Sequence, residues 1–295
     1  MMPHQLNWQE ICQMIPKRKA DAQKGDFGRL LCITGSRNMP GACLLSTQAA
    51  LRGGAGLVTV ATAPENPMRL AAAAPEAMWL PLETDEAGFS AAATRTGKTL
   101  EKQLSRANAV LLGCGLGVTE ETRRLVHWVL EQAVCPVVLD ADGLNCAVSC
   151  IELSRRTGKD WILTPHPGEM ARLTGRSIPQ IQENRVETAT QFAAAYPVTL
   201  ALKGAGTLVA QGSRLAQNPT GNPGMSRGGS GDVLAGLIAA FAAQGIPSWE
   251  AACAGVYLHG LAGDAAAAAL SQQAMLPRDL LVYLPQVLVK LEQER

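Results

Sequence analysis

Aromatic side chains are scarce in this chain of 295 residues, at 4%, and neither sign of charge dominates, because the formal net charge is +1. Its one basic cluster, Lys17-Arg18-Lys19, is better explained as a solvated N-terminal face than as a nucleic-acid patch. The longest apolar runs, such as Val233–Ala243, fall short of the roughly 20 residues that cross a bilayer. The N-terminus lacks a charged-then-apolar signal pattern. We therefore expect a soluble, cytoplasmic protein that binds neither nucleic acid nor membrane.

Cysteine pairs at metal-ligand spacing are also missing. The chain has eight cysteines but no C-x-x-C, and Cys146 and Cys150, one helical turn apart, cannot close a zinc site alone. Five other cysteines lie singly inside or beside apolar segments, and the four histidines never pair at ligand spacing. We expect reduced, buried thiols, as is usual in cytosolic proteins, rather than disulfides or a zinc site.

Several nucleotide and hydrolase motifs are absent or incomplete. No G-x-x-x-x-G-K-[ST] occurs, which excludes a P-loop. Gly113-Cys-Gly-Leu-Gly117 lacks the G-x-G-x-x-G spacing of a dinucleotide fingerprint, and alone it indicates only a tight strand-to-helix turn. Gly228-Gly-Ser-Gly-Asp232 fails the G-x-S-x-G pattern at its last residue, so a serine hydrolase is a poor candidate.

Short apolar strands alternate with helical segments over most of the chain. The first unit has strands at Leu30–Thr34 and Leu57–Ala61 around a glycine loop and a helix over Ala42–Arg52, the pattern that builds a parallel sheet. Further strands are predicted at Ala109–Leu112, Pro136–Leu139, Trp161–Thr164 and Val198–Leu202, a hairpin at Thr207–Ala210 and Arg214–Gln217, and helices over about Thr119–Gln132, Val233–Gln244, Trp249–Leu270 and from about Arg278, with Pro285 as a kink or break. We predict an α/β fold around a mostly parallel sheet.

Polar and glycine-rich loops follow five of the predicted strands. Asp140 ends one strand, His166 lies between two prolines after the next, and Lys203-Gly-Ala-Gly-Thr207 follows a third. Because ligands bind at the carboxyl ends of strands in an open α/β sheet, we expect these residues at one edge of the sheet. The lysine and glycines would let the backbone approach a nucleotide and offer a cation to its phosphate, with a solvated lysine as the alternative. A rigid histidine at this edge is more often a ligand contact than core filler.

The stretch Asn218–Asp232 combines a turn-rich segment with the start of a helix. Pro, Gly and Asn exclude helix and strand from its first half, and Gly228-Gly-Ser-Gly231 precedes an apolar run of helical length. Glycines before a helix leave backbone N–H groups uncovered at the positive end of the helix dipole, which binds phosphate. Asp232 would repel an anion there unless it takes a proton or faces a cation, which makes it a candidate general base. Capping of the helix by Asp232 is the alternative.

Three carboxylates near the same predicted edge, Asp140, Asp142 and Glu169, could help hold a magnesium ion. Mg²⁺ usually takes one or two carboxylates plus substrate phosphates, so no dense cluster is expected. Helix capping is the alternative for Asp142 and Glu169. Phosphate loops, a lysine and an aspartate at a helix N-terminus together suit phosphoryl transfer from a nucleotide.

Taken in order, these segments resemble the ADP-dependent NAD(P)H-hydrate dehydratases, a branch of the ribokinase-like superfamily. Asn218–Leu234 resembles their N-x-T-G-N-P-G-M-x-x-G-G-T-G-D-V-L signature. Earlier segments match in order: Lys24-Gly25 to Gly28, Gly35-Ser36 with Gly41-Ala42, Gly113-x-Gly-Leu-Gly117, Asp140–Asn145, Thr164–Glu169 and Lys203–Thr207. Cys114 and Ser230 replace the usual proline and threonine, but the flanking glycines and the hydroxyl are kept. The resemblance covers nearly the whole chain from about residue 20.

The resemblance implies a ribokinase-like, three-layer α/β/α fold in a single domain over residues 1–295, without the epimerase domain often fused upstream. It implies nicotinamide nucleotide repair, in which the C6 hydroxyl of the S epimer of hydrated NADH or NADPH is removed while ADP becomes AMP and phosphate. ADP and Mg²⁺ would be the cofactors. An NAD(P)H-hydrate epimerase would act in the same pathway, and the protein would be a homo-oligomer, a tetramer by family analogy.

The resemblance also implies site residues. The nucleotide would bind at Lys203, Gly204, Ala205, Gly206, Thr207 and Gly231. The hydrated dinucleotide would contact Ala42, Gly115, His166 and Asp232. As a mechanism, we expect Asp232 to take the proton of the hydroxyl, whose oxygen attacks the β-phosphate of ADP, while the amides of the glycine loop, including Gly229 and Gly231, stabilise the developing charge.

Two other interpretations remain open. A small-molecule kinase of the same superfamily would phosphorylate a thiazole, pyrimidine or sugar hydroxyl with ATP. The dehydratase is favoured over such a kinase by Asn218–Met225 and Thr164–Glu169, which resemble the dehydratase signature. A nucleotide-sensing or scaffold protein would have lost catalysis, and the intact Asp232 argues against that. The preference for ADP over ATP comes only from the resemblance.

Overall fold

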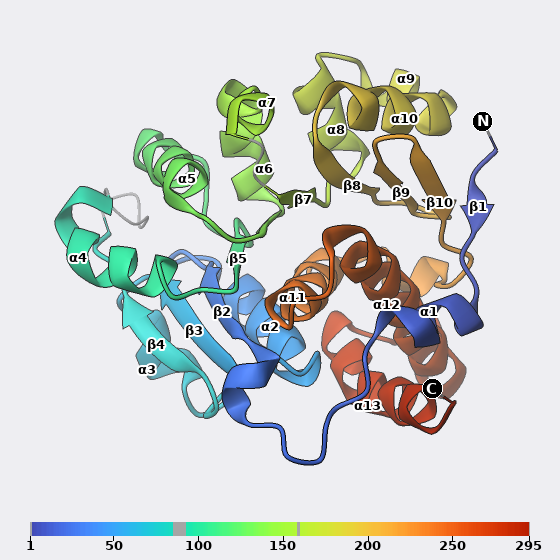
Figure 1. The fold of residues 1–295 in the computed structure, drawn as a ribbon, viewed down its shortest axis with the longest axis horizontal. Coiled ribbons are helices and arrows are strands. Elements are labelled where there is room, and N and C mark those ends of the chain that lie inside the picture. The colour runs from blue at the N-terminus through green and yellow to red at the C-terminus, as the bar shows by residue number, and fades with distance from the viewer. Residues whose placement is uncertain (1, 85–92, 158–159, 295) are drawn as a thin grey trace.

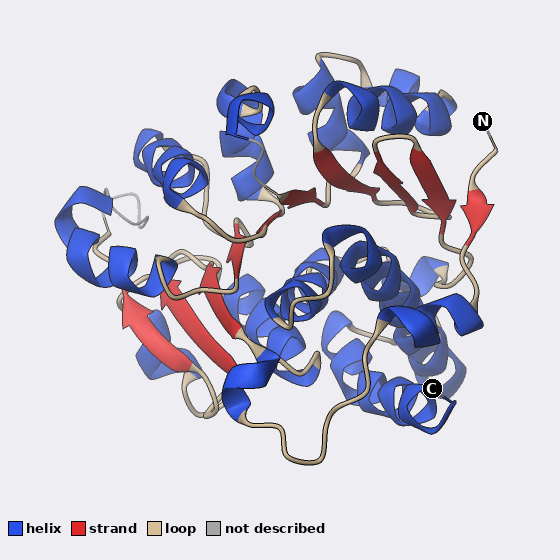
Figure 2. Ribbon diagram, in the orientation of Figure 1, coloured by secondary structure: helices blue, strands red, loops and turns tan. Residues whose placement is uncertain are grey.

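The computed structural model describes residues 2–84, 93–157 and 160–294. Within these ranges, ten strands form one sheet in the order β1-β10-β9-β8-β7-β6-β5-β2-β3-β4 (Figures 1 and 2). Only β9 runs antiparallel to its neighbours, β8 and β10. The strands are β1 (His4–Gln5), β2 (Arg29–Ile33), β3 (Leu57–Thr62), β4 (Met78–Pro81), β5 (Ala109–Leu112), β6 (Val137–Leu139), β7 (Trp161–Leu163), β8 (Val198–Leu202), β9 (Leu208–Gln211) and β10 (Arg214–Gln217). The mostly parallel sheet is confirmed.

Helices cover both faces of the sheet (Figure 1). One face carries α1 (Trp8–Met14), α2 (Pro40–Arg52), α3 (Asn66–Leu70), α11 (Ser230–Ala243), α12 (Ser248–Leu270) and α13 (Pro277–Glu294). The other carries α4 (Ala93–Leu104), α5 (Glu120–Gln132), α6 (Asp142–Ala147), α7 (Leu153–Thr157), α8 (Pro167–Thr174), α9 (Ile178–Glu183) and α10 (Arg185–Ala195). The three-layer α/β/α prediction is confirmed. None of the helices in the described part of the chain is long and apolar enough to span a membrane.

Two cores lie between these layers, and the central strands contribute to both. Along β2, Leu30 and Cys32 pack under α2 and α11, whereas Leu31 and Ile33 pack under α4 and α5. A strand covered by helices on both faces is apolar at every position, which explains why the central strands appear as continuous apolar runs in the sequence.

Helix α11 is the element that presents Asp232, and its small residues set its place. Gly236 lies so close to α2 that a Cβ at this position would stand 2.2 Å from the carbonyl oxygen of Ser46. Twelve of the fourteen residues of α11 are buried. The helix is therefore held against α2 and the sheet, and its first turn is fixed at the carboxyl edge of the strands.

The structure corrects three details of the sequence prediction. Helix α11 begins at Ser230 rather than at Val233, so Gly231 and Asp232 belong to its first turn. Pro285 does not end α13, because the buried Leu281, Leu284 and Leu291 hold the helix against its neighbours on both sides of the proline. The turn-rich stretch also contains a short 3₁₀ turn at Pro223–Met225.

Candidate active site

The first turn of α11 presents backbone donors. Gly229 precedes the helix with φ at +106°, a left-handed conformation that favours glycine. The amides of Ser230 and Val233 donate to loop carbonyls at 3.2 Å each. Between them, the amides of Gly231 and Asp232 have no protein acceptor among the described residues. Open amides at a helix N-terminus can bind an anion.

Asp232 projects from this turn toward two other polar groups. One ligand-type atom each of Asp232, Asp140 and Cys114 lies within 4.8 Å of the others. Burial raises the pKa of Asp232 to about 6, and the charge of Asp140 adds to the effect. The capping alternative is wrong, because the residue at the cap position is Gly229, with no side-chain capping bond. The carboxyl group faces the site.

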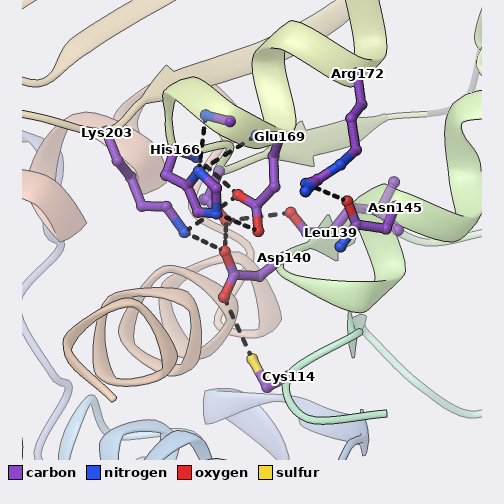
Figure 3. Close-up of polar contacts among 10 residues, drawn as sticks. Cys114, Leu139, Asp140, Asn145, His166, Glu169, Arg172 and Lys203 are labelled. Atoms are coloured by element: carbon purple, nitrogen blue, oxygen red, sulfur yellow. Dashed lines mark hydrogen bonds and ion pairs between the residues drawn. The ribbon is translucent and has the colours of Figure 1, made fainter. Parts of the chain in front are cut away.

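Lys203 and Asp140 form the charged centre of this edge (Figure 3). The Nζ atom of Lys203 lies 2.6 Å from Oδ1 of Asp140 and 3.8 Å from Oε2 of Glu169. Thr164 Oγ1 donates to the same Asp140 oxygen at 2.7 Å. Burial alone would lower the pKa of Lys203, but the carboxylates of Asp140 and Glu169 outweigh it and raise the pKa. Lys203 is therefore an ammonium, and the alternative of a freely solvated lysine is wrong.

His166 is the N-cap of α8, and hydrogen bonds fix its side chain. Its Nδ1 accepts the amides of Gly168 at 2.9 Å and Glu169 at 3.3 Å, and its own amide donates to Oε2 of Glu169 at 2.8 Å. The two reciprocal bonds with Glu169 form a capping box. About half of the His166 side chain is exposed, and burial followed by the charge of Lys203 lowers its pKa. The ring is therefore neutral, with its Nε2 3.3 Å from Oε1 of Glu169 and half of the side chain exposed at the edge of the sheet. Burial and the charge of Asp140 raise the pKa of Glu169 to about 7.

Ala42 and Gly115 lie side by side although they are far apart in the sequence. Gly115 has φ at +64°, and a Cβ at this position would stand 2.7 Å from the Cβ of Ala42. The carbonyl of Gly115 accepts the amide of Ser36 at 2.6 Å, which ties the loop after β5 to the loop after β2. The structure thus brings two of the predicted substrate residues together at the carboxyl edge.

This close approach yields a prediction. Gly115→Ala is expected to lower the free energy of unfolding by more than Gly117→Ala, by an extra ~1–3 kcal/mol, because both positions have positive φ but only Gly115 meets another side chain. Gly117 is the matched control, since its φ is +81° and a Cβ at this position would have no atom within 4 Å. Urea unfolding of the two variants measures the difference. Equal losses would show that the approach of Ala42 does not constrain Gly115.

Arg185, a residue that sequence reasoning missed, fixes the loop Lys203–Thr207 by hydrogen bonds to its carbonyl oxygens. Arg185, the first residue of α10, donates to the carbonyls of Leu202, Ala205 and Gly206 at 3.1, 2.9 and 3.4 Å. No motif marks this arginine, because its partners are backbone atoms 17 to 21 residues away in the chain.

The first half of the signature stretch packs against α12. Asn218 donates from Nδ2 to the carbonyl of Val256 at 3.1 Å, and Asp264 accepts from the amide of Gly221 and the side chain of Asn222 at 2.9 Å each. These side chains shape the loop that leads into the first turn of α11. Their contacts in the structure are internal, whereas Asp232 faces the site.

The candidate metal carboxylates divide into two sets. Asp142 Oδ2 accepts the amide of Gly117 at 2.7 Å, so its carboxylate supports a neighbouring loop. Asp140 and Glu169 instead lie around the ammonium of Lys203. Asp142 therefore supports a loop, and the helix-capping alternative does not describe it, because α6 has no side-chain capping bond. Glu169 both takes part in capping α8 and faces the charged centre.

Other chemical interpretations find little support. Ser230 Oγ is buried and has no hydrogen-bond partner within the described ranges, and the buried His259 bonds to the Ser230 carbonyl at 3.0 Å instead. A serine hydrolase is therefore not supported. A cavity of about 530 Å³ lies on the surface of α9 and α10, and of the residues discussed above it touches only Arg185.

Comparison with known proteins identifies the family to which the chain belongs. Residues 30–286 match the sequence model of a family described as NAD(P)H-hydrate dehydratase. The chain is 42% identical over 281 residues to the bifunctional NAD(P)H-hydrate repair enzyme Nnr of Moorella thermoacetica, an alignment that covers 95% of the chain and 53% of the relative. It is 38% identical over 257 residues to the ADP-dependent (S)-NAD(P)H-hydrate dehydratase of Neisseria meningitidis, covering 84% and 80%. The chain thus spans about half the length of the bifunctional relative.

Solved structures agree with the fold. A ribokinase-like superfamily protein of Enterococcus faecalis superposes with a TM-score of 0.84 at 30% identity, covering 98% of this chain and 96% of that one. An ADP/ATP-dependent NAD(P)H-hydrate dehydratase of Bacillus subtilis, co-crystallised with ATP and Mg²⁺, superposes with a TM-score of 0.81 at 30% identity, covering 98% and 99%. The ribokinase-like fold is confirmed.

Proposed function

Because the chain belongs to the NAD(P)H-hydrate dehydratase family, we propose that it removes water from the S epimer of hydrated NADH and NADPH while converting ADP to AMP and phosphate. One observation links the proposed reaction to particular residues of the site. Asp232 lies at the start of α11, beside two amides without a protein acceptor among the described residues and within reach of the charged pair Lys203–Asp140. A base, an anion site and a cation meet there, as phosphoryl transfer to a hydroxyl requires.

The proposed mechanism has two steps. Asp232 accepts the proton of the C6 hydroxyl, and its oxygen forms a bond to the β-phosphorus of ADP as the bond to AMP breaks. The amides of Gly229, Gly231 and Asp232 stabilise the charge on the transferring phosphoryl group. The C6–O bond then breaks with phosphate as the leaving group. The lone pair of the ring nitrogen compensates for the lost electrons, and loss of a ring proton restores the dihydronicotinamide.

The remaining roles rest on the family resemblance and on position. Lys203–Thr207 and Gly231 would bind the nucleotide, with the ammonium of Lys203 near its phosphates. Ala42, Gly115 and His166 would contact the hydrated dinucleotide along the same edge. Gly231 fits this arrangement, since a Cβ there would lie 3.2 Å from Nζ of Lys203 and would crowd the cation.

Magnesium fits the donor set at this edge. Asp140 and Glu169 are buried carboxylates that share one ammonium, that of Lys203, and burial followed by the charge of Asp140 raises the pKa of Glu169. We propose that these two carboxylates face the ion that accompanies the nucleotide phosphates. When bound, the ion would supply charge neutralisation to the phosphates.

The chain is further proposed to act as one domain over residues 1–295 in the cytoplasm, as a homo-oligomer and alongside an NAD(P)H-hydrate epimerase. A reducing compartment suits its cysteines, which form no disulfide among the described residues.

A direct assay separates the proposal from its alternatives. The full chain is incubated with hydrated NADH, ADP and Mg²⁺, and the absorbance of the restored reduced nicotinamide is followed. We expect reduced nicotinamide and AMP to appear in equal amounts. A stable phosphorylated product formed from ATP would support a small-molecule kinase, and nucleotide binding without turnover would support a sensor.

The site also predicts a pH dependence. Asp232 has its pKa raised to about 6, and only the ionised carboxylate accepts a proton. We therefore expect kcat/KM to be level at high pH and to fall about tenfold per pH unit below the pKa of Asp232. Initial rates from about pH 5 to pH 9 measure this limb. Glu169→Gln separates the two carboxyls: the limb should remain in that variant, and its loss would assign the titration to Glu169.

A further inference from the structure

The side chain of Arg185 contacts the loop Lys203–Thr207 at the backbone carbonyls of the loop and not at its side chains. Its two terminal nitrogens donate to the carbonyl oxygens of Leu202, Ala205 and Gly206 at 3.1, 2.9 and 3.4 Å. The planar fork of a guanidinium suits such a set of fixed acceptors, and a lysine ammonium cannot reproduce it. The loop is correspondingly close: a Cβ at Gly204 would stand 2.4 Å from Nη1 of Arg185.

These contacts determine the direction of two amides. The described chain contains no cis peptide bond, so the carbonyl and the N–H of each peptide point in opposite directions. The carbonyls of Ala205 and Gly206 point at Arg185. The N–H groups of Gly206 and Thr207, which belong to the same two peptides, therefore point away from it. Among the described residues, neither amide has a protein acceptor.

The charge of Arg185 is also uncompensated. No carboxylate in the described ranges lies within 4.0 Å of its guanidinium, and its buried Nε has no hydrogen-bond partner there. Burial lowers the pKa of Arg185. The guanidinium thus holds the carbonyl side of the glycine loop, and the two open amides on the other side can donate to an anion.

We propose that Arg185 is a positioning residue, which turns the amide N–H groups of Gly206 and Thr207 toward the phosphates of the bound nucleotide. This rests on the proposed function, in which Lys203–Thr207 binds that nucleotide. Arg185 itself touches the loop carbonyls and not the nucleotide, so its effect is on nucleotide affinity and not on the chemical step.

Two substitutions separate the effect of the planar guanidinium of Arg185 from the effect of its charge. Arg185→Lys keeps the charge but loses the fork, and Arg185→Gln keeps two donors but loses the charge. Both are expected to raise the Kd for ADP, measured by calorimetry on the full chain, by at least ~10-fold, because hydrogen bonds from a charged group are lost or loosened. The KM for ADP should rise in parallel, with a smaller change in kcat and none in the KM for hydrated NADH.

Arg176→Gln is the matched control. Arg176 donates to Thr188 at 3.3 Å and Gln191 at 2.8 Å, so it also packs on α10 but does not touch the loop. Its Kd for ADP should stay within about twofold of the unsubstituted chain, since it contributes only to packing on the helix. Melting temperatures of all three variants report on the fold, which a purely structural role would change without a selective loss of ADP affinity.

Amide resonances test the orientation directly. Addition of ADP to the labelled, unsubstituted chain should shift the N–H signals of Gly206 and Thr207, and the shifts should be reduced in Arg185→Lys at saturating ADP. Folded Arg185 variants that bind ADP like the unsubstituted chain would overturn the inference and leave the proposed function intact. Failure of the unsubstituted chain to bind ADP would overturn it too. Normal ADP binding without dehydration would instead overturn the proposed function and leave the inference standing.

Discussion

Asp232→Asn is expected to reduce turnover of hydrated NADH by ~10²–10⁴-fold, the usual contribution of a general base. The asparagine is of the same size but cannot take the proton of the C6 hydroxyl. The amides of Gly231 and position 232 remain in place, so the Kd for ADP should change little. The absorbance of restored NADH gives the rate, and calorimetry gives the Kd.

The same variant should be more stable than the parent chain at neutral pH. Asp232 is buried near Asp140, and its pKa is raised to about 6 from an ordinary value of 3.8. A carboxyl with a raised pKa loses stability as the pH rises from the unfolded value through the folded one, because ionisation is then unfavourable only in the folded state. Removing that charge should add on the order of 2 kcal/mol to the free energy of unfolding above pH 6 and little near pH 4.

A loss of activity coupled to a gain in stability would identify Asp232 as a group held for chemistry and not for the fold. Glu250→Gln is the matched control, since Glu250 also lies in the first turn of a helix, α12, but pairs with Arg214 away from the site. Its turnover should stay near that of the parent. Turnover by the Asp232→Asn variant at a near-parental rate would show that Asp232 is not the general base.

Sequence alone placed much of this site because strand periodicity and turn residues are local signals. The parallel sheet brings the ends of β6, β7 and β8 to one edge, so Asp140, His166 and Lys203 could be expected together from their positions after predicted strands. The start of α11 was placed three residues too late, since Gly229–Asp232 have poor intrinsic helix propensity and tertiary packing overrides it.

Side-chain direction and backbone partners were beyond the sequence signals. Asp142 and Asp140 are two residues apart, yet one turns to the amide of Gly117 and the other to Lys203. Ala141, which separates them, has φ at +49°, and no local pattern in the sequence predicts that conformation. Arg185 was missed because its acceptors are carbonyl oxygens, which are present at every residue. By contrast, capping by Glu169 was among the alternatives that the sequence offered, because a carboxylate near the start of a predicted helix is a local signal.

Lys203→Met should affect both stability and activity. The substitution keeps the length and the buried stem but removes the cation that lies 2.6 Å from Asp140 and 3.8 Å from Glu169. Because it leaves a buried carboxylate without its partner, it is expected to lower the free energy of unfolding by ~3–5 kcal/mol at neutral pH. It should also weaken ADP binding and turnover sharply, since the phosphates lose a cation. Lys290→Met, at an exposed lysine near the ring of Trp8, should leave both quantities nearly unchanged.

The double variant Lys203→Met with Asp140→Asn distinguishes the two effects. If the stability loss of the single variant comes from the unpaired Asp140 carboxylate, neutralising that carboxylate should restore much of the free energy of unfolding. Turnover should not return in the double variant, because the nucleotide still lacks its cation. Restored turnover would mean that Lys203 serves only to balance Asp140 and has no role at the phosphates.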